Sequence, residues 1–253
     1  MNNFQIGKLP EFLKFKSGSD LIRVGRYYDG GYLVSQKDIE MSDFLLSLGI
    51  NDDWSFEQGF VKINNTVKVH AYDASVRSWH FFKRAVKLLF RLRLTKSLLY
   101  IQKFLSFKIF FSGDKLHIEK YISNINIDNY LSMSEVLNRI KSDKIFLKID
   151  IEGYEYRILN SILENSDRIT GLAIEFHDCD LHLDRIREFI LNFQCKLIHV
   201  HANNSSYIDN NQLPLTLELT FSKHAQLIDN KTLPHPLDMP NNKNENEIKL
   251  IFD

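Results

Sequence analysis

The chain reads DFLLSLGINDDWSFE at residues 43–57, and this stretch decides the fold. Its first part is apolar on both faces, which is typical of a buried parallel strand. The apolar run turns at Gly49, and two adjacent acids, Asp52 and Asp53, come shortly after. Because glycine lets a backbone turn sharply and approach a bound molecule closely, the stretch predicts a strand whose carboxyl end delivers backbone to a ligand.

Similar apolar runs recur along the chain, and segments with helical spacing separate them. We expect helices at 154–165 and 181–193, where apolar residues recur every three to four positions. This alternation predicts an α/β fold with a doubly wound, mostly parallel, seven-stranded Rossmann-like sheet, and a chain of 253 residues suits a single domain, 1–253. Strands are expected at 43–50, 67–73, 144–150, 171–178 and 195–204, with an antiparallel strand at 213–223, a loop at 229–246 and a last strand at 247–253.

The composition narrows the function classes and the cellular setting. Lysines and arginines number 32 and aspartates and glutamates 32, so the net charge is zero and does not favour a nucleic-acid partner. Two cysteines fit a reducing compartment, and residues 1–15 lack the basic head and apolar run of a signal peptide. No apolar stretch reaches the roughly 20 residues of a transmembrane segment. We therefore expect a cytoplasmic protein.

One segment, residues 78–111, departs from this alternation. It is basic, aromatic and helical in period, and residues 77–108 contain no acid. It predicts an inserted helical segment whose cations form a solvated face. Two other interpretations stay open: a substrate lid or homodimer arm that recognises an anionic group such as a diphosphate, or a peripheral membrane helix.

Polar residues at the ends of the first two strands predict a cofactor site. Ligands of open α/β sheets bind beyond the carboxyl ends of the strands. Asp73 ends the second strand just over 20 residues after Gly49, a position that suits hydrogen bonds to both hydroxyls of a ribose. A dinucleotide fingerprint needs three spaced glycines, and SLGINDD has one. Acids such as Asp52 instead favour a cationic sulfonium ligand, S-adenosylmethionine, over NAD, with a plain solvated loop as the alternative.

Six segments together resemble the FkbM-type and related METTL-like S-adenosylmethionine-dependent methyltransferases. They are YYDGGYLV (27–34), SLGINDDWSFE (47–57), VHAYD (69–73), FLKIDIEGYEYRIL (146–159), IEFHD (174–178) and HVHANN (199–204). The resemblance implies a methyltransferase sheet and methyl transfer to an oxygen, often on sugars or other secondary metabolites. It also implies that Ser47 and Gly49 belong to the cofactor loop and that Asp73 binds the ribose; we assign Ser75 to the same site. It does not extend to the insert 78–111.

Acids and histidines end the later strands, where an acceptor hydroxyl would have to lose its proton. Asp150 ends one strand, and Glu175 and His177 share a face at the end of the next. His201 shares a face with His199, which we assign to the core. If these strands are neighbours, Asp150, Glu175, His177 and His201 converge on one pocket.

Two mechanisms fit such a pocket. In the first, His177 or His201 acts as a general base, with Asp150 beside it. In the second, Asp150, Glu175 and His177 hold a divalent metal, Mg²⁺ or Mn²⁺, which lowers the pKa of the acceptor hydroxyl. The metal-free base is slightly favoured, because neither spacing is a metal signature by itself.

Three further residues have weaker assignments. Glu152 lies on the turn IEGYE, where it caps the next helix or contacts the amino group of the cofactor. Tyr32 follows the turn Asp29–Gly31, which we interpret as a cover over the cofactor, and we assign Tyr32 to stack on the cofactor or to form a hydrogen bond with it. A simple hairpin is the alternative. Glu57 is expected in the first turn of the following helix, in a structural or a functional role.

The sequence thus predicts an S-adenosylmethionine-dependent O-methyltransferase that acts on a hydroxyl of a small molecule, a sugar or nucleotide-linked sugar. The rivals are a nicotinamide-dependent oxidoreductase and a non-catalytic, membrane-peripheral scaffold. High asparagine and lysine usage is typical of an AT-biased bacterial gene, in which methylation of a surface glycan or capsule would fit.

Overall fold

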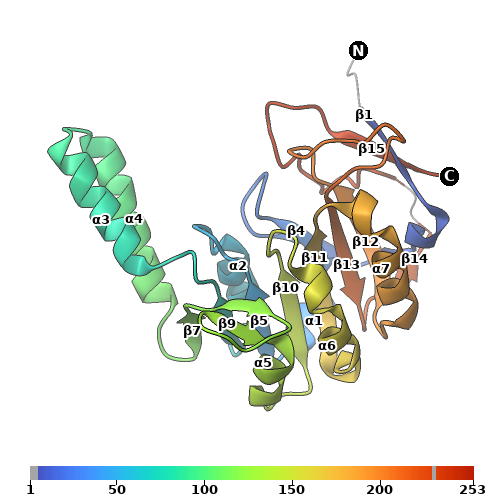
Figure 1. Ribbon diagram of the computed structural model, residues 1–253, viewed down its shortest axis with the longest axis horizontal. Coiled ribbons are helices and arrows are strands. Elements are labelled where there is room, and N and C mark those ends of the chain that lie inside the picture. Colours follow the sequence, from blue (N-terminus) through green and yellow to red (C-terminus); the bar gives the residue numbers. More distant parts are fainter. Residues whose placement is uncertain (1–4, 230–231) are drawn as a thin grey trace.

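A computed structural model describes residues 5–229 and 232–253, and a seven-stranded sheet forms its centre (Figure 1). The strand order is β12-β13-β11-β10-β5-β6-β7. Within this sheet the pairs from β11 to β7 are parallel, and β13 is antiparallel to both β11 and β12. The doubly wound, mostly parallel sheet is therefore confirmed. Its strands are β5 (Phe44–Leu48), β6 (Lys68–Tyr72), β7 (Lys115–Ile118), β10 (Ile145–Ile149), β11 (Ile169–Phe176), β12 (Lys196–Ala202) and β13 (Leu217–Ser222).

Burial on both faces explains why the central strands are continuously apolar. Every residue of β5 and β10 is buried. Leu46 and Leu147 pack into the core on one side of the sheet, whereas Leu45 and Phe146 pack into the core on the other. Neighbouring residues of a strand point to opposite faces, so a strand between two layers needs apolar side chains throughout.

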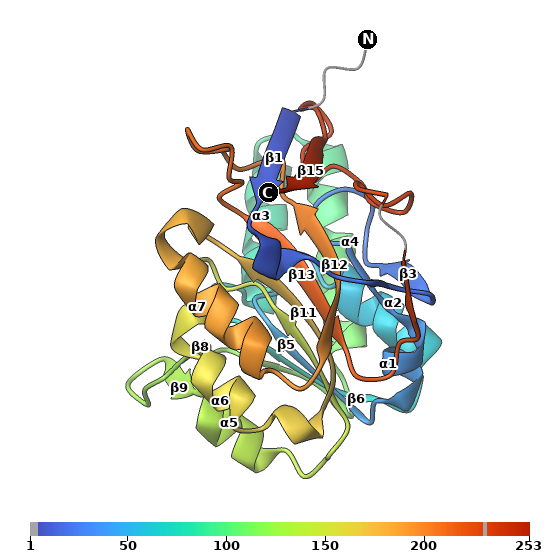
Figure 2. The same ribbon diagram turned by 90° about the vertical axis from the view of Figure 1, so that its right-hand side faces the viewer.

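Helices cover both faces of the sheet. Figure 2 shows α5 (Met133–Arg139), α6 (Leu159–Leu163) and α7 (Cys179–Asn192) on one face and α1 (Gln36–Met41) and α2 (Ser55–Ile63) on the other. Serine caps begin two of them: the hydroxyls of Ser35 and Ser132 each accept a backbone N–H from the first turn at 3.3 Å.

The continuous helix predicted for 154–165 is interrupted. A single 3₁₀ turn, Glu155–Arg157, precedes the short helix α6. The chain leaves β10 through two residues with positive φ, Glu152 and Gly153, and the buried carboxylate of Glu155 accepts the backbone N–H of Ile151 at 3.0 Å. Glu155 is therefore held at the strand end, and this tight turn replaces the first turn of the expected helix.

The last predicted strand lies outside the central sheet. β15 (Ile248–Phe252) pairs in parallel with β1 (Gln5–Leu9) in a sheet of two strands. The seventh strand of the main sheet is β7, a short, half-exposed edge strand that the sequence analysis missed. The predicted loop at 229–246 has no helix or strand at 229 and 232–246, and residues 230–231 lie outside the described part.

The smaller elements frame this core. β3 (Leu21–Val24) and β4 (Tyr32–Ser35) form an antiparallel hairpin, so the alternative interpretation of the DGGY turn is correct for the backbone. The others are η1 (Glu11–Leu13), β2 (Ser17–Gly18) paired with β14 (Leu227–Ile228), β8 (Tyr121–Ser123) paired with β9 (Tyr130–Ser132), and η3 (Ser166–Arg168).

The insert forms a pair of helices, α3 (Ser78–Phe90) and α4 (Leu94–Phe110), which projects away from the sheet (Figure 1). At its base, Trp54 packs edge-on against Phe107 at a centroid distance of 5.1 Å and also contacts Phe81. The helical character of the insert is therefore confirmed. Among the described residues, no helix combines the length and apolarity needed to cross a membrane.

Candidate active site

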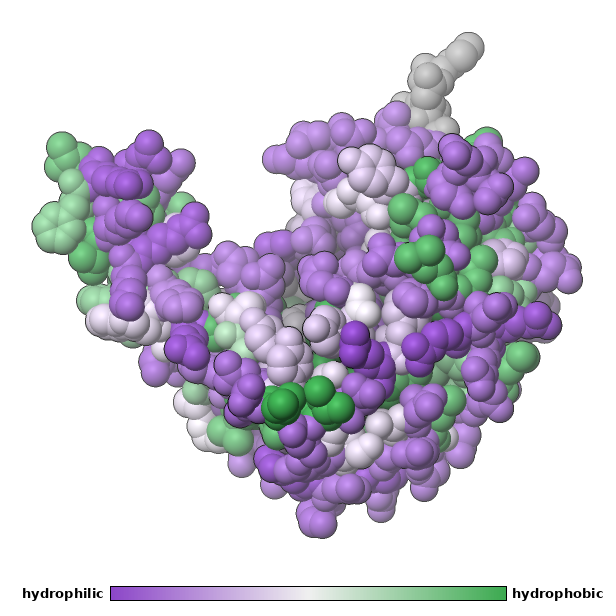
Figure 3. All heavy atoms as spheres, viewed as in Figure 1, coloured by the Kyte–Doolittle hydropathy of each residue, from purple (hydrophilic) through white to green (hydrophobic). Residues whose placement is uncertain are grey.

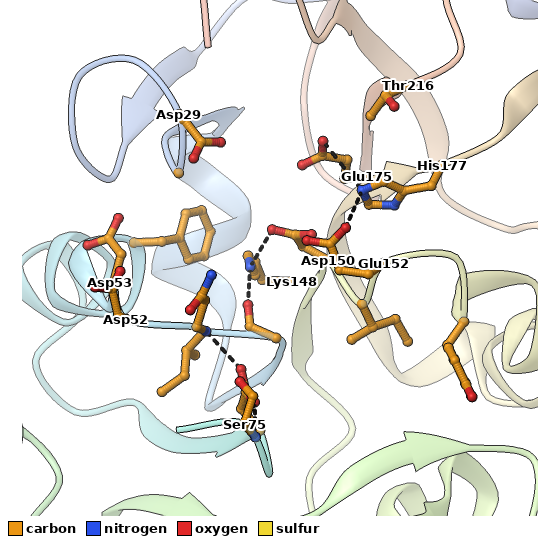
Figure 4. Close-up of a pocket in the computed structure, with 18 of the residues that line it drawn as sticks. Asp29, Asp52, Asp53, Ser75, Lys148, Asp150, Glu152, Glu175, His177 and Thr216 are labelled. Carbon is orange, nitrogen blue, oxygen red and sulfur yellow. Dashed lines mark hydrogen bonds and ion pairs between the residues drawn. The ribbon is translucent and has the colours of Figure 1, made fainter. Parts of the chain in front are cut away.

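A pocket of about 650 Å³ opens at the carboxyl ends of the central strands. It lies where the order of the sheet reverses between β5 and β10, which is the usual ligand position in open α/β sheets. Figure 4 shows Lys148, Asp150, Glu175 and His177 together, with Asp52 and Asp53 across from them. The pocket also contains Gly49, Asp73, Ser75 and Glu152 from the predicted site.

Gly49 makes the turn out of β5 that the sequence predicts. Its φ is +76°, and a Cβ at this position would lie 1.7 Å from the carbonyl oxygen of Asp150. Its own carbonyl accepts a hydrogen bond from Nζ of Lys148 at 2.5 Å. No other residue type would fit between these two strand ends.

Asp73 is fixed at the end of β6. Its Oδ2 accepts the backbone N–H of Asn51 at 2.8 Å. Its Oδ1 accepts the backbone N–H and the hydroxyl of Ser75 at 2.7 and 2.6 Å. A carboxylate has about four lone-pair sites, so one on Oδ2 stays available to a ligand. Both Asp73 and Ser75 border the pocket, as predicted for a cofactor site.

Ser47 and Tyr32 lie beneath the pocket and are not part of its lining. The hydroxyl of Ser47 donates to the buried carboxylate of Glu57, in the first turn of α2. The hydroxyl of Tyr32 lies 3.2 Å from Asp150 and 3.1 Å from Glu175. The structure therefore places both residues as supports of the pocket floor.

The acids after Gly49 are paired with cations from other segments. Asp52 binds Lys103 of α4 at 2.6 Å, and Asp53 binds Arg26 at 3.1 Å. Arg26 belongs to the loop between β3 and β4, which borders the pocket through Arg26, Asp29 and Gly30. This loop lies over one side of the pocket, where the sequence predicts a cover.

Asp150, Glu175 and His177 converge as predicted. One ligand atom of each lies within 4.8 Å of the others. Burial, followed by repulsion from Asp150 and Glu218, raises the pKa of Glu175 to about 8. The amide of Asn203 donates to its Oε1 at 2.8 Å.

His177 is surrounded by carboxylates. Its Nδ1 lies 3.1 Å from Glu155, and its Nε2 lies 3.5 Å from Glu152 and 3.8 Å from Glu175. Burial alone would lower the pKa of His177, but the hydrogen bond to Glu155 and the neighbouring negative charges raise it to about 9. The ring is therefore oriented by Glu155, which the sequence analysis did not select.

Lys148 is a second residue that the sequence analysis missed. It is buried in the middle of β10, and its Nζ lies 3.4 Å from Asp150. Burial opposes its charge, but Asp150, Glu57 and Glu175 outweigh that effect and raise the pKa of Lys148. A lysine within the apolar run KIFLKI was the available signal, because an unpaired buried charge is too costly.

The structure does not bring His201 into the pocket. Its Nδ1 lies 2.9 Å from Glu218 and its Nε2 3.2 Å from Glu247, and it is not among the lining residues. The reason is that β13 lies between β11 and β12, which moves β12 to the edge. His199 is buried beside Asp238, as its core assignment requires.

Comparison with known proteins gives one family match. The model of the methyltransferase FkbM domain matches residues 36–206, well over half of the chain. No curated protein matches this chain.

Solved structures with a similar arrangement include three methyltransferase-related proteins. A precorrin-6y C5,15-methyltransferase from Geobacter metallireducens has 11% identity and a TM-score of 0.38, covering 74% of this chain and 86% of that one. Fibrillarin from Methanococcus jannaschii, a pre-rRNA processing protein, has 9% identity and a TM-score of 0.37, covering 75% and 70%. TYW2 from M. jannaschii, solved with AdoMet, has 9% identity and a TM-score of 0.33, covering 81% and 87%.

TM-scores this far below 0.5 carry no weight for function, so the assignment rests on the family match. The match spans the strands that border the pocket from β5 to β12. It also includes the glycine turn, Asp73 and the acid and histidine cluster. The chain belongs to the FkbM methyltransferase family, whose members are S-adenosylmethionine-dependent methyltransferases.

Proposed function

We propose that this methyltransferase transfers a methyl group to a hydroxyl of a sugar or nucleotide-linked sugar. The observation that carries the proposal is the cluster of Asp150, Glu175 and His177 beside the glycine turn. O-methylation needs an acceptor oxygen that is held in line and relieved of its proton. A cluster of acids and an imidazole at the pocket wall supports that chemistry.

The cofactor side of the pocket fits S-adenosylmethionine. Asp73 is held rigidly and keeps a free lone pair toward the pocket, which suits a ribose hydroxyl. Gly49 lets the backbone approach the ligand, and Glu152 adds negative charge near a cationic sulfonium, whereas the charge of Asp52 is balanced by Lys103. When bound, S-adenosylmethionine supplies an electrophilic methyl group. The residues of the chain hold it and orient it toward the acceptor.

The acid and histidine cluster fits a divalent metal better than a free base. Two carboxylates and one imidazole form a donor set that suits Mg²⁺ or Mn²⁺. The Nδ1 of His177 is held by Glu155, which leaves Nε2 toward the pocket, and an imidazole whose other nitrogen is bonded to a carboxylate is typical of a metal ligand. We therefore assign Asp150, Glu175 and His177 as metal ligands, in place of the base that the sequence slightly favoured. A bound cation would lower the pKa of the acceptor hydroxyl.

Support for a sugar acceptor comes from tyrosines that border the pocket. Tyr130 and Tyr154 stack at a centroid distance of 6.0 Å and an interplanar angle of 22°. Tyr121 and Tyr207 also border the pocket. Flat aromatic faces with hydroxyls match a sugar ring, which has an apolar C–H face and a polar rim.

Incubation with S-adenosylmethionine and a panel of nucleotide sugars tests the function. Mass spectrometry should show an acceptor that gains the mass of one CH₂. EDTA should stop turnover, and added Mg²⁺ or Mn²⁺ should restore it. Binding of Mn²⁺, followed by electron paramagnetic resonance without substrate, should disappear in Asp150→Asn and persist in the control Asp180→Asn. Methylation that continues in EDTA would exclude the metal but not the O-methyltransferase.

The bacterial and cytoplasmic setting and the role in a surface glycan or capsule rest on composition and on the resemblance. They stay predictions, as does the homodimer.

A further inference from the structure

The turn between α3 and α4 exposes large apolar side chains to water. Phe90, Leu92 and Leu94 have exposed fractions of 83%, 86% and 62%. Arg91 and Arg93 lie between them. Scattered apolar residues are ordinary on a protein surface, but three consecutive alternate positions at the end of a projecting hairpin form a continuous apolar tip.

The apolar surface continues along both helices of the hairpin. Figure 3 shows hydrophobic residues along its outer edge, away from the body, and hydrophilic residues on the side toward the body. A lid would turn its apolar residues toward the pocket, so this orientation does not favour a lid. Further exposed apolar residues are Trp79, Phe82 and Leu89 on α3 and Leu98, Leu99, Leu105 and Ile109 on α4.

The charge of the hairpin has one sign. Residues 77–111 contain nine lysines and arginines and no acid. Because the whole chain has a net charge of zero, the remainder has a net charge of −9. All the cations of the hairpin except Lys103 are exposed. The hairpin is both apolar and cationic, whereas the rest of the chain has a negative net charge. An anionic surface would therefore attract the hairpin and repel the rest of the chain.

We propose that the α3–α4 hairpin docks onto an anionic lipid bilayer. The apolar tip would enter the boundary between headgroups and acyl chains, and the arginines and lysines would contact lipid phosphates. Two of the three apolar tip residues, Leu92 and Leu94, are aliphatic, which suits hydrocarbon better than stacking on nucleic-acid bases. Pairing of two hairpins from two copies of the chain would bring like charges together. The aliphatic tip therefore favours lipid over nucleic acid, and the charge of the hairpin favours lipid over a second copy of the chain.

The base of the hairpin connects this surface to the pocket. Lys103 of α4 binds Asp52, and the side chain of Gln58 in α2 lies 3.4 Å from Ser106. Trp54, which follows the cofactor loop, is buried against Phe81 and Phe107. Docking of the hairpin would thus hold the pocket at a fixed position near the bilayer. The proposal itself does not depend on the identity of the acceptor.

Sedimentation of the full chain with lipid vesicles tests the proposal. We expect the protein to pellet with vesicles of phosphatidylcholine mixed with phosphatidylglycerol and to stay in solution with phosphatidylcholine alone. Raised salt should release it, because screening weakens exposed charge interactions. A wild-type protein that stays in the supernatant with the anionic vesicles at low salt would overturn the proposal.

One triple variant and one double variant distinguish binding through the tip from non-specific hydrophobic adsorption. Phe90→Ser/Leu92→Ser/Leu94→Ser should lower the partition coefficient by at least roughly tenfold, since each large apolar side chain contributes on that order. The control Leu181→Ser/Leu191→Ser removes side chains of α7 that are 73% and 70% exposed, and it should bind vesicles like the wild type.

Unchanged affinity for S-adenosylhomocysteine in both variants verifies that the body is folded. Equal loss of vesicle binding in both variants, or none in the tip variant, would reject the hairpin as the docking element. If the wild-type chain does not bind vesicles but forms dimers that the tip variant does not form, the partner of the hairpin is a second copy of the chain. If the wild-type chain does not bind vesicles but shifts RNA in a gel, the partner is RNA.

Discussion

At the scale of single residues, Asp73 is the side chain that we propose to bind the ribose of the cofactor. Asp73→Ala should weaken the binding of S-adenosylhomocysteine by about 1.5–3 kcal/mol, because it removes a charge-assisted hydrogen bond to the ribose. Titration calorimetry measures this change. Asp209→Ala is a matched control, since Asp209 also accepts loop N–H groups, from Asn211 and Leu213, but lies outside the pocket lining. Equal affinities for Asp73→Ala and the wild type would refute the assignment.

Gly49 gives a stability prediction with an internal comparison. Gly49→Ala places a Cβ 1.7 Å from a backbone oxygen at a φ of +76°, so neighbouring strand ends must move. We expect a loss of more than the roughly 1–3 kcal/mol of backbone strain alone. Gly113→Ala has a similar φ of +62° but open space around it, so it should lose only the strain term. Urea unfolding compares the two, and similar losses would disprove the steric argument.

Some residues of the site could be predicted from the sequence, and others could not. Asp150, Glu175 and His177 could be predicted because each follows an apolar run, and strand ends of a parallel sheet meet at one edge. The role of Glu155 could not be predicted, because it depends on His177 at the end of another strand, whereas Lys148 had a signal, a lysine within an apolar run, but its partners could not be named from the sequence. A buried lysine is acceptable only where several carboxylates converge, and that convergence is a property of the folded sheet.

At the scale of elements, His201 joins three segments. It lies on β12, Glu218 lies on β13, and Glu247 precedes β15. Burial lowers the pKa of His201, but these carboxylates and the charge of Asp238 raise it well above its ordinary value. A raised folded-state pKa stabilises the fold fully below the unfolded value of about 6.5, and this contribution is lost as the pH rises through the folded-state value.

His201→Gln should therefore reduce the free energy of unfolding most below the unfolded pKa of about 6.5 and progressively less as the pH rises above it. Chemical denaturation at several pH values measures the difference from the wild type. The exposed His80 of α3 serves as control, and His80→Gln should have the same small effect throughout. A cost for His201→Gln that does not shrink with rising pH would contradict the ion pairs.

Elements that are buried along their whole length could be predicted from the sequence, whereas elements that are partly buried and partly exposed could not. The fully buried strands β5 and β10 can be recognised as apolar runs that are interrupted only by Ser47 and Lys148. β7 is short and half-exposed, with a lysine and a histidine among its four residues. The position of His201 was predicted wrongly for a related reason. β12 is the next strand after β11 in the sequence, but in the sheet β13 lies between them.

At the scale of the whole molecule, a neutral net charge conceals a strong separation of charge. The helical period of 78–111 reveals which residues share a face, but it does not reveal what that face meets. Only the projection of α3 and α4 from the sheet shows that their outer edge has no partner within the described chain. Overall composition is therefore a poor guide to the surfaces that this protein offers.

The antiparallel strand β13 has a consequence for how the protein is made. It is later in the chain than β12, yet in the central sheet it is the strand with which β12 pairs. As the polypeptide emerges from a ribosome, β12 has no strand in the central sheet to pair with until residues 217–222 have been synthesised. A nascent chain halted at Thr216 would lack β13, β14 and β15, and without β13 both β12 and the free edge of β11 would stay unpaired and accessible to chaperones and proteases.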